Sequence, residues 1–441
     1  MKAIIKSCLV LVLIFLGFSC NKDEVEPGRP EAIEAPLTEM RKLISIAPLT
    51  GPKETLVTIK GKNFGTDGNR IRVLFNDKEA SLEAVSDTEL SVIVPAKAFS
   101  GKVKVIVGET VLSGPDYTYQ ITEVQVTTFA GSSGGYANGS AENAKFKYPR
   151  GIAMDTDGNL YIADRSNHRI RKITPSGVVS TLAGKTLGDQ EGIGENAQLG
   201  NPSDIAIDRY GQLYVTDSNR DKIWHIDLSA AVTTLAGGIE GDSDGRGVNA
   251  RLNSPRGIAI GADGAAYFSD SNNNKLCRIT ANGEVSTLAG SRSGDADGTQ
   301  ENAEFNNPRG VASDTDGNLY VADRSNDRIR KISPSGVVST IAGKSQGSVD
   351  GPVSSASFNN PRDLTVDPEG NIYVADSGNN RIRKISPDGV VSTLAGSDIG
   401  NTDGVGAIAK FNKPIGILID EERTLFVVDN LNHRIRKITQ E

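Results

Sequence analysis

The sequence has few cysteines and no apolar run long enough to cross a bilayer. Its three cysteines are Cys8, Cys20 and Cys277. They are too few for a disulfide framework, and no Cys-x-x-Cys redox pair is present. We expect Cys277, which lies far from the other two, to be a small buried apolar side chain.

The chain also has no excess of basic residues, because its 48 Lys and Arg are outnumbered by 55 Asp and Glu, which gives a net charge of −7. The chain therefore lacks the overall basic footprint of a nucleic-acid-binding protein, and its excess of carboxylates disfavours peripheral binding to anionic lipid. Aromatic residues make up only 5%, so platforms for stacking sugar rings are few. No phosphate loop or Ser-His-Asp grouping appears.

The N-terminus has the pattern of a signal peptide at residues 1–19. Two lysines precede an apolar stretch at 8–18, about half the ~20 residues that a membrane-spanning helix needs. Residues 16–20 (Leu-Gly-Phe-Ser-Cys) resemble a bacterial lipobox, which implies cleavage before Cys20 and lipidation of its thiol. The alternative is an ordinary secretory signal with an incidental cysteine.

The residues after Cys20 indicate where in the cell the protein is expected to lie. The sequence Asn-Lys-Asp-Glu at 21–24 resembles the surface-export signal of Bacteroidota lipoproteins. That resemblance implies a lipid-anchored protein exposed on the outer membrane; the alternative is a solvated, charged tether. Residues 20–40 are rich in Glu and Pro without periodicity, which predicts a flexible tether.

Residues 41–120 contain several short β-branched runs between Gly and Pro turn signals, such as 56–59 and 103–107. Such strands within about 80 residues predict an immunoglobulin-like sandwich. The sequences at 51–65, 94–95 and 113–119 resemble the IPT/TIG family. In exported proteins this family implies a spacer or a protein-contact module.

The rest of the chain, residues 124–441, is an internal repeat with a period of 53 residues. The repeat is seen in prolines before an apolar run: Pro149, Pro202, Pro255, Pro308, Pro361 and Pro414. It is also seen in aspartates at the end of the next strand: Asp164, Asp217, Asp270, Asp323, Asp376 and Asp429. Six such units account for the whole segment.

Each unit contains four short strands, which we call a to d, joined by turn residues. Repeated four-stranded units predict a six-bladed β-propeller, since closing a ring removes exposed sheet edges. The last unit ends after its strand c, and residues 126–129 supply a spare strand before the first unit. We therefore predict an all-β chain whose propeller is closed by this N-terminal strand.

The repeat units resemble NHL repeats. The matching sequences in the first unit are Pro-Arg-Gly-Ile-Ala-Met-Asp at 149–155, Gly-Asn-Leu-Tyr-Ile-Ala-Asp at 158–164 and Asn-His-Arg-Ile-Arg-Lys-Ile at 167–173. The resemblance implies the propeller fold but not one function, because NHL propellers serve as sensors, RNA binders, protein-contact modules and occasional lyases.

Residues that recur in every unit are predicted to be structural. The six aspartates at the ends of strand b are expected to cap backbone N–H groups. The aromatic residue three positions earlier is expected to pack between blades, as is Trp224, the only Trp.

Candidate ligand-binding residues lie on the face that carries the long loops between strands d and a. Arginines follow the repeat proline in four units: Arg150, Arg256, Arg309 and Arg362. Four guanidiniums around one mouth predict binding of carboxylates, sulfates or an acidic glycan; the alternative is that each pairs with a local Asp. Tyr136 and Tyr148, in the first long loop, are candidates for stacking on sugar rings; the alternative for each is ordinary packing within the protein.

No catalytic residue, metal or cofactor is predicted. His168 and His433 occupy equivalent positions off the axis, too far apart in a ring of six to share an ion. The sequences at 155–158 and 314–317 resemble the start of a Ca²⁺ loop, but they lack its later ligands and fit hairpin turns better.

The order of anchor, tether, IPT/TIG domain and NHL propeller resembles the cell-surface glycan-binding proteins of Bacteroidota. It implies a non-catalytic lipoprotein that binds extracellular polysaccharide. One alternative is a scaffold for a surface protein partner. Another is a propeller enzyme, either a lyase or a Ca²⁺-dependent lactonase.

Overall fold

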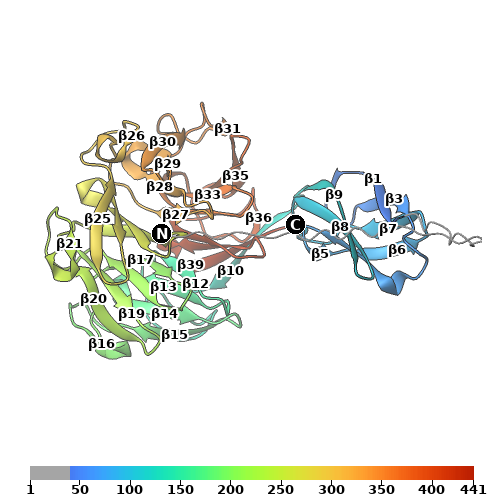
Figure 1. The fold of residues 1–441 in the computed structure, drawn as a ribbon. Coiled ribbons are helices and arrows are strands. Elements are labelled where there is room, and N and C mark those ends of the chain that lie inside the picture. The colour runs from blue at the N-terminus through green and yellow to red at the C-terminus, as the bar shows by residue number, and fades with distance from the viewer. Residues whose placement is uncertain (1–39) are drawn as a thin grey trace, which may run out of the picture.

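The structure, a computed structural model, describes residues 40–441. The predicted signal peptide, the lipidated Cys20 and nearly all of the tether lie outside the described residues. The described chain forms two all-β parts, a small sandwich and a larger ring of sheets (Figure 1). The only helices in this part of the chain are three-residue 3-10 turns.

The sandwich has two sheets that enclose one apolar core. The first contains, in spatial order, β1 (Lys42–Ala47), β3 (Leu56–Lys62), β7 (Glu89–Ile93) and β6 (Ser81–Val85). The second contains β2 (Thr50–Gly51), β9 (Thr110–Tyr119), β8 (Gly101–Val107), β4 (Ile71–Phe75) and β5 (Lys78–Glu79). Alternate residues such as Val57 and Ile59 are fully buried, as expected for strands with one face on a core.

The remaining strands form six sheets of five strands each. Blade one contains β11 (Gly139–Ser140), β12 (Ile152–Met154), β13 (Leu160–Asp164), β14 (Arg169–Ile173) and β15 (Val178–Ala183). Blade two contains β16 (Gly192–Ile193), β17 (Pro202–Ile207), β18 (Leu213–Asp217), β19 (Lys222–Ile226) and β20 (Ala231–Gly237). Blade three contains β21 (Gly245–Arg246), β22 (Pro255–Ile260), β23 (Ala266–Asp270), β24 (Lys275–Ile279) and β25 (Glu284–Ala289).

Blade four contains β26 (Gly298–Thr299), β27 (Val311–Ser313), β28 (Leu319–Asp323), β29 (Arg328–Ile332) and β30 (Val337–Ala342). Blade five contains β31 (Gly351–Pro352), β32 (Pro361–Val366), β33 (Ile372–Asp376), β34 (Arg381–Ile385) and β35 (Val390–Ala395). Blade six contains β36 (Gly404–Val405), β37 (Pro414–Ile419), β38 (Leu425–Asp429), β39 (Arg434–Gln440) and β10 (Val124–Ala130).

The ring closes as the sequence predicts. Strand β10 pairs antiparallel with β39, so that Val126 lies opposite Ile438. Figure 1 shows these two strands side by side. The first and last innermost strands, β12 and β37, are also in contact. The predicted six-bladed propeller with an N-terminal closing strand is confirmed.

The prediction of four strands per blade was incomplete. A fifth, two-residue strand comes from the loop between strands d and a; for example, Gly139 pairs with Val179 at the outer edge of blade one. Two residues are too short to show any periodicity in a sequence. This strand covers the outermost edge of each blade, so part of each long loop is held in a sheet.

Candidate anion-binding site

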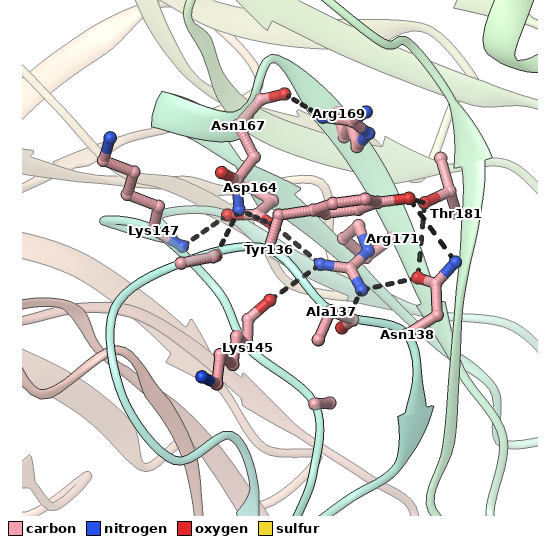
Figure 2. Close-up of polar contacts among 12 residues, drawn as sticks. Tyr136, Ala137, Asn138, Lys145, Lys147, Asp164, Asn167, Arg169, Arg171 and Thr181 are labelled. Atoms are coloured by element: carbon pink, nitrogen blue, oxygen red, sulfur yellow. Dashed lines mark hydrogen bonds and ion pairs between the residues drawn. The ribbon is translucent and has the colours of Figure 1, made fainter.

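The recurring aspartates at the ends of strand b hold the long loops in place, and Figure 2 shows the first of them, Asp164. Asp164 accepts the backbone N–H of Lys147 and the side-chain amide of Asn167. Its other partner is Arg171 on β14, whose Nη1 lies 2.8 Å from Asp164 Oδ2 with both side chains fully buried. The capping role is confirmed, and the capped N–H belongs to the loop that crosses the blade.

Blades four, five and six repeat this ion pair, whereas blades two and three do not. Trp224 takes the arginine position in blade two and donates its indole N–H to Asp217, fully buried as predicted. Cys277 takes it in blade three, so Asp270 has no arginine partner, and burial raises the pKa of Asp270 to about 7. Cys277 is buried, as predicted.

Tyr136 and Tyr148, predicted to face a ligand, have partners within the protein. The Tyr136 ring lies 3.8 Å below the Arg169 guanidinium, and its hydroxyl is hydrogen-bonded to Thr181 (Figure 2). The Tyr148 ring packs edge-on against His433 in the neighbouring blade. Both rings are partly exposed, but neither lines the hollow at the propeller axis.

That hollow has a cavity volume of about 30 Å³ and is lined by the residues that begin the innermost strand of every blade. The structure brings together here the four predicted arginines, Arg150, Arg256, Arg309 and Arg362. Blades two and six contribute Ser203 and Ile415 instead. The repeat proline places each of these side chains at the inner end of its blade.

The four arginines, which we call the ring arginines, have few partners. Among the described residues, none of them forms an ion pair with a carboxylate. Arg309 Nε donates to Asn307 Oδ1 at 3.0 Å. The Nε atoms of Arg150, Arg256 and Arg362 are buried without a hydrogen-bond partner. The alternative of local Arg–Asp pairs is therefore not seen at this site.

Burying the ring arginines close together is electrostatically unfavourable. Burial, and then the charge of neighbouring arginines, lowers the pKa of all four ring arginines, for Arg256 and Arg362 to about 10. Since an arginine side chain remains protonated in proteins, these charges stay and repel one another. An anion in the hollow would relieve both the repulsion and the missing hydrogen bonds.

Two further arginines act on this site and were missed in the sequence. Arg165 and Arg324 lie in the 3-10 turns η2 (Arg165–Asn167) and η7 (Arg324–Asn326), between strands b and c of blades one and four. Their charges contribute to the lowered pKa of Arg150 and Arg256. The sequence did contain a signal, because only blades one and four have arginine at this repeat position. The equivalent residues in the other blades are Ser218, Ser271, Ser377 and Asn430.

Two aspartates, also missed, form the floor of the hollow. Asp204 and Asp363 stand where the other blades have glycine; Asp363 is buried and Asp204 is partly buried. Asp204 Oδ2 accepts the N–H of Ile258, and Asp363 Oδ2 accepts that of Ile417, each in the following blade. Burial raises the pKa of both, for Asp204 to about 7.

These carboxyls explain the glycines beside them. A Cβ at Gly151 would lie 2.2 Å from Asp204 Oδ1, and one at Gly310 would lie 2.1 Å from Asp363 Oδ1. Blades two and five, which carry the aspartates, face each other across the ring. Both aspartates also line a second hollow of about 250 Å³ farther along the channel, so they lie between the two spaces.

The described residues also bear on the sequence patterns that suggest a metal site. No three His, Cys, Asp or Glu side chains in this part of the chain group closely enough to hold a metal ion. Asp155 Oδ1 caps the N–H groups of Asp157 and Asn159, as expected for a hairpin turn. Within residues 40–441 no helix has the length and apolar character to cross a bilayer.

One short sequence pattern matches a catalytic motif but lacks the structure of that motif. Residues 241–245 read Gly-Asp-Ser-Asp-Gly, which fits the Gly-x-Ser-x-Gly pattern of a nucleophile elbow. Such an elbow turns from a strand into a helix, whereas this segment runs into the edge strand β21. The pattern is therefore coincidental.

Comparison with known families defines the class of protein. The IPT/TIG domain model matches residues 42–121, and the NHL repeat model matches 146–173 and 358–385. A model described as the SMP-30/Gluconolactonase/LRE-like region matches 194–343. The chain is thus an IPT/TIG domain followed by an NHL-repeat β-propeller.

Two curated relatives each match somewhat more than half of this chain. Protein SUPPRESSOR OF QUENCHING 1, chloroplastic, from Arabidopsis thaliana is 32% identical over 58% of this chain, and teneurin-3 from Danio rerio is 30% identical over 56%. The chain spans only 26% and 10% of the length of these relatives. Both are therefore much larger proteins.

Solved structures match nearly the whole chain. A structural genomics protein of unknown function from Bacteroides thetaiotaomicron superposes with a TM-score of 0.67 at 23% identity, covering 92% of this chain and 99% of that one. An auxiliary nutrient binding protein from the same organism has a TM-score of 0.57 at 21% identity, covering 92% and 98%. At these identities the likeness shows the two-part fold.

Proposed function

We propose that this protein is a non-catalytic binding protein that captures an anionic extracellular polysaccharide at the mouth of the propeller axis. The observation that carries the proposal is the set of ring arginines, which converge on one hollow without a carboxylate partner among the described residues. Charge-assisted hydrogen bonds from arginine are the strongest recognition that a protein offers to sulfate, phosphate or carboxylate groups.

Two further observations support a binding role. A structure that shares the two-part fold is described as an auxiliary nutrient binding protein. The ring arginines project from strand ends on a closed scaffold, so they are held in place before a ligand arrives, which lowers the entropic cost of binding.

We also propose that the protein acts at the cell surface, anchored through Cys20 with residues 21–40 as the tether. Support comes from the lipobox-like residues 16–20 and the acidic residues that follow them. In that arrangement the IPT/TIG sandwich is a spacer between membrane and propeller. Metabolic labelling with a clickable fatty acid tests the anchor: wild type should be labelled and Cys20→Ala should not.

Affinity electrophoresis tests the binding proposal. Purified protein is run through gels that contain uronate-rich, sulfated or neutral polysaccharides. An acidic polymer should retard the wild type, while a variant with all four ring arginines changed to Ala should migrate freely. The control variant Arg209→Ala/Arg246→Ala/Arg292→Ala, altered at exposed arginines, should be retarded like the wild type. Free migration of the wild type in every gel would refute polysaccharide capture.

A further inference from the structure

The ring arginines without an Nε partner are not arranged at random around the axis. Arg150, Arg256 and Arg362 belong to blades one, three and five, which alternate around the closed ring. The fourth, Arg309 in blade four, has its Nε bonded to Asn307. The three arginines whose Nε has no partner therefore have approximate threefold symmetry about the propeller axis.

Threefold symmetry suits one class of anionic group. A sulfate or phosphate ester presents three terminal oxygens in a cone around its ester bond. A carboxylate has only two oxygens, which lie in one plane, so it cannot place a separate oxygen toward each of the three arginines. The geometry points to a tetrahedral oxyanion on the axis, with one terminal oxygen toward each of Arg150, Arg256 and Arg362.

The surroundings of the three arginines fit such a group. Arg165 and Arg324, in opposite blades, add positive charge to the same mouth. Asp204 and Asp363 close the hollow below, and their carboxyl oxygens face backbone N–H groups of neighbouring blades rather than the arginines. We therefore place the oxyanion at the end of the ligand or on a protruding sugar, with the rest of the ligand outside the hollow.

We therefore infer that the axial site recognises a sulfate or phosphate ester end-on, in preference to a carboxylate. The inference rests on the proposed function only in taking a polysaccharide as the molecule that carries the ester. The preference of the site for a sulfate or phosphate group does not depend on the proposed function. A free inorganic anion has the same tetrahedral group, and the two sources can be separated by experiment.

Isothermal titration calorimetry in chloride buffer at constant ionic strength tests the inference. The ligands are inorganic sulfate, inorganic phosphate, acetate, glucose 6-sulfate and glucose. We expect sulfate, phosphate and glucose 6-sulfate to bind and compete with one another, and acetate to bind at least about tenfold more weakly. Acetate binding as tightly as sulfate would overturn the inference.

Single substitutions separate the three arginines from the fourth. Arg150→Gln, Arg256→Gln and Arg362→Gln should each weaken sulfate binding by about tenfold or more, because each removes a charge-assisted hydrogen bond. Arg309→Gln should weaken it less, since Asn307 already occupies its Nε. Far-UV circular dichroism checks that each variant folds. An equal loss in all four variants, or no loss, would contradict the threefold site.

The two proposals can fail separately. If glucose 6-sulfate binds but no polysaccharide is retained in gels, capture of polysaccharide is wrong and the oxyanion site stands. If an acidic polymer retards the wild type and the variant Arg150→Gln/Arg256→Gln/Arg362→Gln equally, the function stands and the threefold site is wrong.

Discussion

Asp164 Oδ2 and Arg171 Nη1 lie 2.8 Å apart in blade one, and both side chains are fully inaccessible to solvent. The arginine also reaches two backbone carbonyls of the loop that crosses the blade, those of Lys145 and Ala137. One buried side chain thus joins strand b, strand c and the incoming loop. The same grouping recurs in blades four, five and six.

Breaking one of these buried pairs should destabilise the propeller strongly. Arg330→Met leaves Asp323 buried without its partner, which costs about 3–5 kcal/mol of unfolding free energy. Urea denaturation measures the loss. Arg292→Met, at a mostly exposed side chain, is the control and should change stability by less than about 1 kcal/mol. Equal effects of the two substitutions would argue against a structural role for the pair.

The unpaired Asp270 should make stability depend on pH. Its folded-state pKa of about 7 lies above the unfolded value near 4, so the fold favours the protonated form. The associated stability is present below about pH 4 and is lost as the pH rises through 7. Asp270→Asn keeps a neutral acceptor for Asn253 N–H, so its unfolding free energy relative to wild type should increase between pH 5 and pH 8.

The control for this experiment is Asp388→Asn, at an exposed aspartate in a turn. Its stability relative to wild type should not change over the same interval. If Asp270→Asn followed the wild-type pH profile at a constant offset, Asp270 would not be the group that titrates.

The closing strand should be essential for the whole ring. Val126 is fully buried beside Ile438, whereas the next residue, Thr127, is exposed on the other face of the strand. Val126→Asp should lower the melting temperature of the propeller by several degrees, and Thr127→Asp should leave it nearly unchanged. Deletion of residues 124–131 should have the larger effect. Wild-type melting of the deletion variant would contradict closure by this strand.

Crowding of the ring arginines should be visible without any ligand. In low-salt chloride buffer, Arg256→Gln should raise the melting temperature, because it removes one of several repelling buried charges. Added sulfate should raise the melting temperature of the wild type more than that of the variant. Differential scanning fluorimetry measures both shifts, and a variant that melts lower and still gains fully from sulfate would contradict the crowding.

Much of the architecture follows from the repeat in the sequence. Residues that recur every 53 positions, such as the Pro149 and Asp164 sets, give the number of blades and the role of the capping aspartates. The ring arginines could be found because they follow the repeat prolines. The two-residue edge strands could not, since they depend on pairing with a partner strand rather than on local pattern.

The rest of the site depends on departures from the repeat. Arg165, Arg324, Asp204 and Asp363 each stand where other units have a different residue, and each could be read in an alignment of the units. Their role at the axial site could not be predicted from such an alignment, because that role depends on the order of the blades around the ring. Tyr136 shows the opposite case: a residue unique to one loop proves to pack on Arg169.

The most direct test of the axial site is an anomalous-diffraction experiment on crystals soaked in selenate, a tetrahedral analogue of sulfate. We expect a selenium peak on the propeller axis, with the selenate oxygens within hydrogen-bonding distance of Arg150, Arg256 and Arg362. Selenium peaks confined to surface lysines and arginines, with the axial hollow empty at saturating selenate, would contradict this expectation.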